Sequence, residues 1–316
     1  MRKILILLTI SMLLVGLFSI TALAEFPERT INVIVGYGAG GGTDNAARSL
    51  SNPAKDYIDV PLVVNNKPGA NGAMASAYVQ NQPADGYTVL FAPSSLSLNI
   101  AMDTVEYTAE DWQPVMRAQS DVSIIATAAD SEFQTIDELV SYAKENPGEV
   151  KIGCVGSITK LYVENFAAKA GIDVTSVIYQ SAGNEQKDAL AGNLHAFQAE
   201  MQEIKGLVDA GKVKPLVFIK GGDRVEDFPE VPTTVEKGWN ATAGIWRGIF
   251  VKAGTPDHIV QYLHDMYKRA MGSDHYKEFE TNNFLFLNPG YLSTEEFEEF
   301  FVKDIETMKG LKDLLE

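Results

Sequence analysis

The sequence predicts an α/β protein, and two observations support this prediction. Short runs of β-branched and aromatic residues alternate with amphipathic helical patterns along residues 25–316, an order typical of α/β folds. Three of these runs pass through small residues into a helical pattern, at 36–44, 92–97 and 153–159. In open α/β sheets, ligands bind at such carboxyl ends of strands.

The N-terminal segment 1–24 has the pattern of a secretory signal peptide. Arg2 and Lys3 precede an apolar stretch, which ends in the small residues Ala22-Leu23-Ala24. A transmembrane anchor is the alternative, but the apolar centre is short and the cleavage pattern is well placed. We therefore expect a mature protein that begins near Glu25, works outside the cytoplasm and has no membrane anchor of its own.

Eight strands and three well-marked helices are expected in the mature chain. Two helices begin with a capping box, Thr135 with Glu138 and Ser293 with Glu296. A third helix is expected to have Thr255 as its N-cap and Pro256 at its first position. The helical patterns cover 135–148, 255–271 and 293–315, and the strand candidates are 31–37, 61–66, 88–93, 122–128, 150–156, 174–180, 194–200 and 214–220.

The first glycine cluster matches the dinucleotide-binding pattern G-x-G-x-x-G over residues 36–41. A nicotinamide site would also need an acidic residue at the end of the next strand. That strand ends in Asn65-Asn66, and the nearest acid, Asp59, precedes it. The loop instead offers backbone N–H groups at a helix start, which favour an anion; a plain tight turn without ligand is the structural alternative.

Composition excludes several other classes. The formal net charge of −16 repels nucleic acid and anionic membranes. The single cysteine, Cys154, rules out an intramolecular disulfide and suits an inert buried position. The four histidines lack metal-ligand spacing, so no zinc site is expected.

One motif would fit an exported serine hydrolase. Ser157-Ile158-Thr159-Lys160 has the S-x-x-K spacing of penicillin-binding enzymes, with Ser157 as the nucleophile. The S-x-N motif at 97–99 precedes it, which is the reverse of the usual order. Hydroxyl groups that cap a helix N-terminus explain these residues more simply.

Several sequence blocks together resemble the extracytoplasmic solute receptors of tripartite tricarboxylate transporters, the Bug family. These blocks include "NKPGANG", "PADGYTVLFAPSS", "FPEVPTTVEKG" and "WRGIFVKAGTP", and the resemblance spans essentially the whole mature chain. It implies a type II-like periplasmic binding protein with two α/β lobes, crossing hinge strands and a cleft. The expected first lobe comprises 25–122 plus 231–316, and the second lobe is 123–230.

The resemblance also implies a function. Such receptors take up a small carboxylated molecule by lobe closure and deliver it to two integral-membrane transporter subunits. It implies no cofactor, no nucleic-acid partner, no catalysis and a monomer. A periplasmic receptor that presents its ligand to a signalling partner would use the same cleft, so this alternative stays open, and the sequence does not name the ligand.

Carried over residue by residue, the resemblance predicts ligand contacts from loops of both lobes and from two further positions. Relatives often have "FPPGG" where this chain has "YGAGG", and Asp-Asn where it has Ala199-Glu200, so the far end of the site differs here. The expected ligand-binding residues are Tyr37, Gly38, Ala39, Gly40, Thr43, Asp44, Pro93, Ser94, Ser95, Gly156, Ser157, Ile158, Thr159, Ser181, Ala182, Gly183, Glu200 and Arg247.

Two charged residues receive specific expectations. Asp44 follows the glycine loop at a helix start and is expected either to brace the loop or also to accept a hydrogen bond from the ligand. Arg247 has apolar neighbours, so it should be buried and need a partner. Its match to the tricarboxylate-receptor branch predicts that it holds a second carboxylate, distal to the one at the loops.

Overall fold

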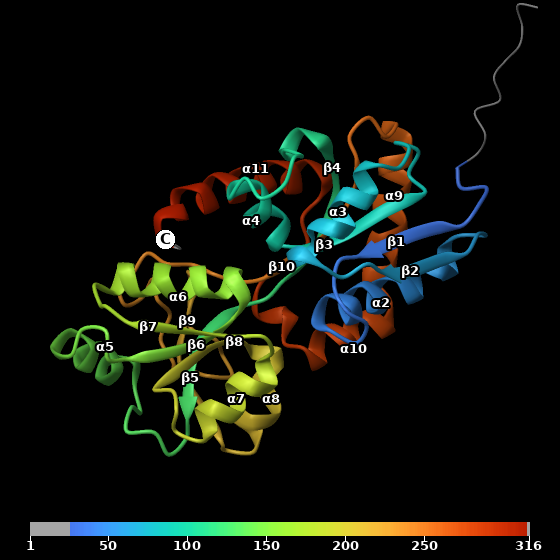
Figure 1. The fold of residues 1–316 in the computed structure, drawn as a ribbon. Coiled ribbons are helices and arrows are strands. Elements are labelled where there is room, and N and C mark those ends of the chain that lie inside the picture. The colour runs from blue at the N-terminus through green and yellow to red at the C-terminus, as the bar shows by residue number, and fades with distance from the viewer. Residues whose placement is uncertain (1–25, 315–316) are drawn as a thin grey trace, which may run out of the picture.

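The computed structural model describes residues 26–314, so the expected signal peptide lies outside the described residues. Within this range the chain forms two five-stranded sheets, with strand orders β2-β1-β3-β10-β4 and β7-β6-β8-β5-β9. Helices cover both faces of each sheet, which gives two α/β lobes (Figure 1). In the part of the chain that the structure describes, no helix combines the length and apolarity needed to cross a membrane.

The first lobe is built from both ends of the described chain. Helices α2, α9 and α10 pack on one face of its sheet, and α3, α4 and α11 pack on the other. Its strands are β1 (Ile31–Val35), β2 (Leu62–Asn66), β3 (Thr88–Pro93), β4 (Trp112–Ser120) and β10 (Trp246–Lys252). Its helices are α2 (Gly42–Ala54), α3 (Ala73–Gln80), α4 (Ser95–Ala101), α9 (Asp257–Met271), α10 (Asp274–Asn282) and α11 (Thr294–Gly310).

The second lobe uses the middle of the chain. Helices α5 and α6 pack on one face of its sheet, whereas α7 and α8 pack on the other. Its strands are β5 (Ser123–Ala128), β6 (Lys151–Val155), β7 (Thr175–Tyr179), β8 (Ala196–Glu200) and β9 (Val213–Phe218). Its helices are α5 (Ile136–Glu145), α6 (Gly156–Ala170), α7 (Ala182–Leu190) and α8 (Met201–Asp209).

Two strands of the first sheet, β4 and β10, are absent from the strands expected from sequence. Strand β4 contains polar residues that are buried by tertiary contacts, such as Arg117, whose Nε donates to the carbonyl of Gly290 at 2.7 Å. Strand β10 contains Gly248, where the ring of Phe297 occupies the space that a Cβ would need. Both strands therefore depend on partners distant in sequence, which a local pattern does not reveal.

The lobes are joined by two crossing segments. Strand β4 ends at Ser120 and β5 begins at Ser123, so only two residues separate the sheets there. The return segment runs from β9 to β10, and its residues 231–243, expected in the first lobe, pack on the second. The amide of Phe218 donates to Pro232 at 3.0 Å, and Trp239 packs edge-on against Phe166. We therefore propose a lobe boundary near residue 244.

The helix-start predictions are confirmed at two of three positions. The capping boxes at Thr135 and Ser293 are both present. Helix α9 instead begins at Asp257 with Pro256 as N-cap, since Pro256 has a non-helical ψ of 138°, and the Thr255 hydroxyl donates to the carbonyl of Lys252 at 2.8 Å. Cys154 is buried as predicted, and burial, followed by the charge of Glu185, raises the pKa of its thiol to about 12.

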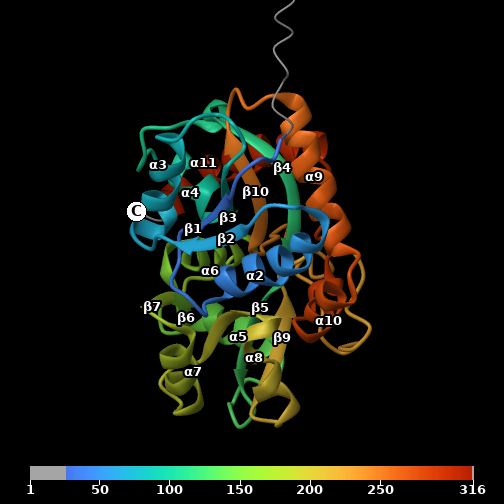
Figure 2. The ribbon, with the colours of Figure 1, turned by 90° about the vertical axis from the view of Figure 1, so that its right-hand side faces the viewer.

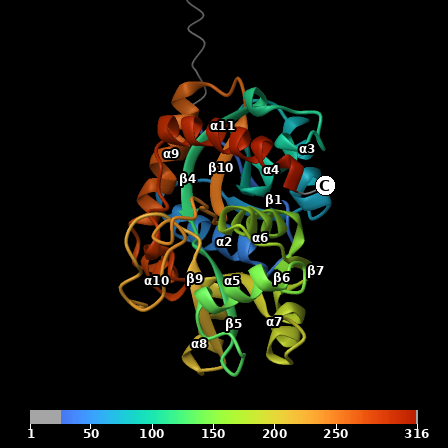
Figure 3. The ribbon, with the colours of Figure 1, turned by 90° about the vertical axis from the view of Figure 1, so that its left-hand side faces the viewer.

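The two lobes touch through helix α6. Its residues Ile158, Leu161 and Tyr162 join the apolar cluster formed by α4, β10 and α11 of the first lobe. The Tyr162 hydroxyl also donates to the carbonyl of Gly244 in the return segment, at 3.1 Å. Figure 3 shows α6 lying beneath α4 and α11. The lobes are thus in direct contact on this side of the hinge.

Gly244 lies where the crossing segments meet, and this position tests how closely they pack. A Cβ there would collide with the backbone carbonyl of Asp121, whereas at Gly221 it would meet only Val235, at 3.9 Å. We expect Gly244→Ala to lower the free energy of unfolding by about 1–3 kcal/mol, since backbone must move to admit the methyl group. Urea unfolding measures this change, with Gly221→Ala as the control. Equal stability of the two variants would contradict this close packing.

Candidate ligand-binding site

Strand register sets which residues lie at the carboxyl ends of the parallel strands in each sheet. Strands β1, β2 and β3 are parallel, and antiparallel β10 pairs with β3 so that Arg247 lies opposite Pro93. In the second sheet, Ser123 at the start of β5 lies opposite Glu200 at the end of β8. Asp121 belongs to the short connection between these edges. The loops that follow β1, β3, β6, β7 and β8 therefore face the junction between the lobes, where Figure 2 shows α2.

The β1–α2 loop presents backbone rather than side chains. Residues 38–42 are exposed, and Gly40 adopts φ +79°, a left-handed conformation that favours glycine. Gly41 is the N-cap of α2 and supplies no side-chain oxygen, so no side chain caps the amides of the first turn. An uncapped helix N-terminus is suited to an anion.

Asp44 braces this loop. Its buried carboxylate accepts from the Gly40 amide at 2.8 Å, from Arg48 Nε at 3.0 Å and from Asn66 Nδ2 at 2.8 Å. Burial raises the pKa of the Asp44 carboxyl, but the bonds from Arg48, Gly40 and Asn66 outweigh it and hold the pKa below its ordinary value. Both oxygens thus have partners inside the protein, which supports the bracing role expected of Asp44.

The β3–α4 loop is held by side-chain contacts inside the first lobe. Ser94 and Ser95 are almost completely buried. The Ser95 hydroxyl lies 2.6 Å from the Tyr37 hydroxyl, which also donates to Asn71 Oδ1 at 3.2 Å. Tyr37 therefore links the first loop to the β3–α4 loop and fixes their relative positions.

The second-lobe loops divide into surface and interior positions. Ser157 and Ser181 are exposed, whereas Ile158 is buried in the apolar contact between the lobes. The Thr159 hydroxyl accepts from the Val155 amide at 2.7 Å and donates to the Val155 carbonyl at 2.8 Å, both at the N-cap residue of α6. No side chain caps the N-terminus of α6, so the capping role expected for Ser157 and Thr159 is not found, and Thr159 instead bonds to the backbone of Val155.

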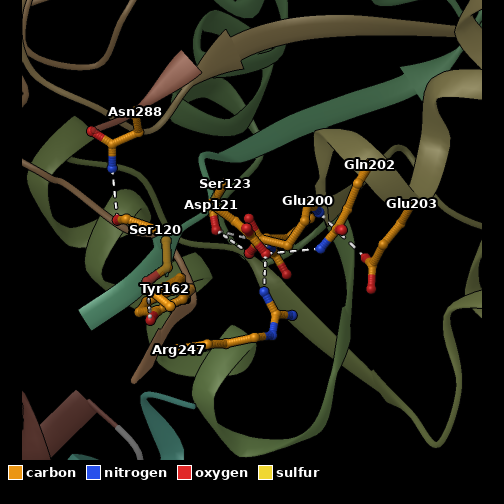
Figure 4. A network of polar contacts seen from close by, with 12 residues as sticks. Ser120, Asp121, Ser123, Tyr162, Glu200, Gln202, Glu203, Arg247 and Asn288 are labelled. Carbon is orange, nitrogen blue, oxygen red and sulfur yellow. Dashed lines mark hydrogen bonds and ion pairs between the residues drawn. The ribbon is translucent and has the colours of Figure 1, made fainter. Parts of the chain in front are cut away.

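Arg247 is buried and paired, as its apolar neighbours indicated. Its Nη1 donates to Asp121 Oδ2 at 2.5 Å, and the same oxygen accepts from Gln202 Nε2 of α8 at 2.8 Å. Burial by itself would lower the pKa of the guanidinium, but the charge and hydrogen bond of Asp121 raise it. Asp121 thus binds one group from each lobe (Figure 4).

The other end of the guanidinium faces the glycine loop. A Cβ built on Gly42 would lie 3.3 Å from Nη2 of Arg247. Arg247 therefore lies beside the uncapped start of α2 and not at the far end of the site. From this position Arg247 is suited to the carboxylate expected at the loop, and not to a second, distal carboxylate.

Glu200 occupies the second-lobe side of the junction. Its side chain is 1% exposed, and its Oε1 accepts from the Ser123 hydroxyl at 2.6 Å and from Gln198 Nε2 at 3.3 Å. Burial, and then the charge of Asp121, raise the pKa of the Glu200 carboxyl to about 8. The Glu200 backbone amide donates to Glu203 Oε2 at 3.3 Å, which orders the start of α8.

The predicted site residues fall into three groups by exposure. Those that form the open loop surface are Gly38, Ala39, Gly40, Ser157, Ser181 and Gly183. The half-buried ones are Tyr37, Gly156 and Ala182. The buried ones are Thr43, Asp44, Pro93, Ser94, Ser95, Ile158, Thr159, Glu200 and Arg247.

Sequence reasoning missed the polar residues of the hinge. Asp121 directly precedes the expected strand 122–128, and an acidic residue at that strand's start in "AQSDVSIIATA" was the available signal. Gln198 and Ser123 lie on β8 and β5, where buried polar side chains break the apolar pattern. These residues, together with Glu200, Gln202, Glu203 and Arg247, form what we call the hinge cluster.

A cleft lies on the α11 side of the hinge. It has a volume of about 620 Å³ and is lined by residues of both lobes, including Tyr162, Asn165, Trp246 and Lys303. Asp121 belongs to its wall, but none of the predicted ligand-binding residues does. Across residues 26–314, no group of three or more histidine, cysteine or acidic residues is placed to hold a metal ion.

A two-lobe α/β fold with paired strand-end loops at a hinge defines the class of periplasmic binding proteins. The family model described as "Tripartite tricarboxylate transporter family receptor" matches residues 46–312. The chain therefore belongs to this family, which is a family of receptors rather than of enzymes, and the resemblance seen in the sequence blocks is confirmed.

Individual relatives agree in length and fold. A Cupriavidus necator protein, "UPF0065 protein in gbd 5'region", is 31% identical over 310 residues, covering 94% of this chain and 91% of its own. A TctC solute binding protein from Polaromonas superposes with a TM-score of 0.79 at 28% identity, over 91% of this chain and 99% of that one. Rpa4515 of R. palustris with adipate superposes with a TM-score of 0.77 at 24% identity, over 92% and 98%, which shows the common fold.

The brace at Asp44 makes a prediction about pH. Because its folded-state pKa is depressed, its contribution should be complete above the unfolded value near 3.9 and be lost as pH falls through the folded value. We expect Asp44→Asn to lower the free energy of unfolding at pH 7 by about 1–3 kcal/mol. Below about pH 4 the deficit should shrink.

Urea unfolding at several pH values measures this difference. Asp56→Asn, which changes an exposed carboxylate in the same lobe, is the control and should stay near wild type throughout. A deficit for Asp44→Asn that is independent of pH would contradict the role of its charge.

Proposed function

We propose that this receptor captures a small carboxylated metabolite between its lobes and delivers it to the two membrane subunits of a tripartite transporter. It acts in the periplasm as a monomer, after removal of its signal peptide, and uses no cofactor. The observation that supports this best is the position of Arg247, whose Nη2 lies beside Gly42 at the uncapped start of α2.

The chemistry of that position suits a carboxylate. Backbone N–H groups of the first helical turn point along the axis of α2 and carry its positive end. A guanidinium at the same place adds N–H donors in a planar fork, which suits the two oxygens of a carboxylate. Each charge-assisted hydrogen bond is worth about 1.5–3 kcal/mol. Such local donors also offset the unfavourable field of a chain with net charge −16.

Lobe closure follows from the placement of donors on both sides of the junction. The loop 38–42 belongs to the first lobe, and the start of α6 and the loop 181–183 belong to the second. A ligand that touches both sets makes its full set of contacts only when the lobes come together, so its binding energy stabilises the closed form.

The comparisons support a carboxylate at the level of the family. The family description names a tricarboxylate transporter receptor, and the R. palustris protein of similar fold holds adipate. On this basis a di- or tricarboxylate is the first candidate class of ligand, and an aromatic carboxylate is the second. The position of Arg247 at the loop accounts for one ligand carboxylate and does not by itself call for a second.

A thermal-shift screen identifies the ligand. The full mature chain is tested with mono-, di- and tricarboxylates, aromatic carboxylates and amino acids. A ligand present at about 100 times its dissociation constant adds about 2.7 kcal/mol to the free energy of unfolding, which raises the melting temperature visibly. At least one carboxylated compound should do so, and a panel without any stabilising carboxylate would refute the proposal.

Variants of Arg247 then test how that compound is held. We expect Arg247→Ala and Arg247→Lys to weaken its binding by about 30-fold or more in titration calorimetry, because a buried charge partner is lost or misplaced. Arg117→Lys, a change at another buried arginine that bonds to Gly290 and Pro289, is the matched control. Binding within about threefold of wild type by folded Arg247 variants would leave Arg247 a purely structural role.

Small-angle scattering tests closure. The radius of gyration should fall when the stabilising compound is added, because the lobes approach each other across the junction. The Arg247→Ala variant at the same compound concentration should stay closer to the unliganded value, because a smaller fraction of it is bound. An unchanged radius for the saturated wild-type protein would show that binding does not depend on closure.

A further inference from the structure

The hinge cluster has more acidic than basic groups. It contains the carboxyl groups of Asp121, Glu200 and Glu203 but only one guanidinium, that of Arg247. Asp121 and Glu200 are 4% and 1% exposed, so water screens them poorly. Since Arg247 forms its ion pair with Asp121, no cation of the cluster pairs with Glu200.

Two acidic oxygens of the cluster lack a hydrogen-bond donor. Asp121 Oδ1 and Glu200 Oε2 are buried and make no hydrogen bond in the described part of the chain, and neither does Nε of Arg247. Leaving such a group unpaired costs about 1–3 kcal/mol, and more when it is charged. An ionised carboxylate accepts hydrogen bonds only, so Asp121 Oδ1, and Glu200 Oε2 whenever Glu200 is ionised, require a donor from outside the cluster.

The position of these oxygens makes the ligand the natural donor. Glu200 lies at the carboxyl end of β8, opposite Ser123, and Asp121 lies in the connection between the two sheet edges. Figure 4 shows their carboxyl groups converging with the Arg247 guanidinium, whose other end reaches Gly42. The acidic oxygens therefore lie across the guanidinium from the proposed carboxylate site.

The charge of the donor can be argued from the same groups. A second ligand carboxylate at this end would meet the negative charge of Asp121, and it cannot supply the donor that Asp121 Oδ1 lacks. The described residues also offer no set of three ligands for a metal ion. A primary ammonium supplies three N–H donors and a positive charge, and it meets both requirements.

We propose that the ligand is an amino acid in the broad sense, which carries a primary ammonium group as well as a carboxylate. The carboxylate lies at the start of α2 with Arg247, and the ammonium lies at Glu200 and Asp121. This assignment rests on the proposed receptor function and refines its ligand class. It replaces the expectation of a second carboxylate at Arg247.

The assignment has a consequence for protons. With a pKa raised to about 8 by burial and then by Asp121, Glu200 holds a proton at neutral pH in the empty receptor. An arriving ammonium stabilises the carboxylate, so the proton leaves to the buffer as the ion pair forms. Binding at pH 7 should therefore release up to one proton per ligand. Affinity for the amine should rise with pH up to about 8 and then level off. If a protonated Glu200 instead donated to the ligand, affinity would fall as pH rises through the same range.

Matched pairs of compounds test the proposal by titration calorimetry on the full mature chain. The pairs are glutamate with glutarate, aspartate with succinate, 4-aminobutyrate with butyrate, and alanine with propionate. In at least one pair the amine should bind about tenfold or more tightly than its partner, which corresponds to about 1.4 kcal/mol. Repeating the titration in buffers of different ionisation enthalpy should reveal the released proton.

The Glu200→Gln variant tests the residue itself. Its amide oxygen can still accept from Ser123, so the fold should be retained, but affinity for the amine should fall about tenfold or more and proton release should disappear. Glu185→Gln is the matched control, because Glu185 is equally buried in the same lobe, has a pKa raised to about 9 by burial, and lies outside the cluster. The control should keep wild-type affinity and proton release.

The outcomes separate this inference from the proposed function. If only compounds without an amine bind, or if Glu200→Gln leaves affinity and proton release unchanged, the ammonium assignment is wrong and the carboxylate receptor stands. If no carboxylated compound of this set or of the wider screen binds, both fail. If Glu200→Gln does not fold, the protons that the wild-type protein exchanges with the buffer on binding still decide. Proton uptake, or no proton exchange, on binding an amine would overturn the assignment.

Discussion

The ion pair between Arg247 and Asp121 is the interaction on which the rest of the site depends. Arg247 is the second residue of β10 in the first sheet, and Asp121 lies in the two-residue connection to the second sheet. Because both side chains are buried, removing either partner would leave an uncompensated charge at the hinge. The pair also orients the guanidinium, so that Nη2 faces Gly42. Asp121 at the same time accepts a hydrogen bond from Gln202 of the other lobe.

This arrangement divides the junction into two electrostatic halves. The uncapped start of α2 and Arg247 make one half attractive to anions, although the chain as a whole is strongly acidic. Glu200 and the free oxygen of Asp121 make the other half a set of acceptors. A receptor built in this way selects by the positions of opposite charges on its ligand, and penalises a compound whose charges are alike or reversed.

The sequence predicts the α/β class, the eight strands with clear local patterns and the strand-end loops, because these depend on short-range periodicity and on glycine. It misses β4 and β10, whose burial relies on Arg117 reaching Gly290 and on Phe297 packing over Gly248. It predicts that Arg247 is buried and paired, but not with which residue. Asp121 lies 126 positions away, and only the crossing of the chain between the lobes brings them together.

A crystal structure of the receptor with a stabilising carboxylate bound tests this account most directly. The account predicts a ligand carboxylate within hydrogen-bond distance of the first-turn amides of α2 and of the Arg247 guanidinium, with the rest of the ligand directed toward Glu200. A ligand bound instead in the cleft of about 620 Å³ between α6 and α11, with the loop 38–42 unoccupied, would contradict it.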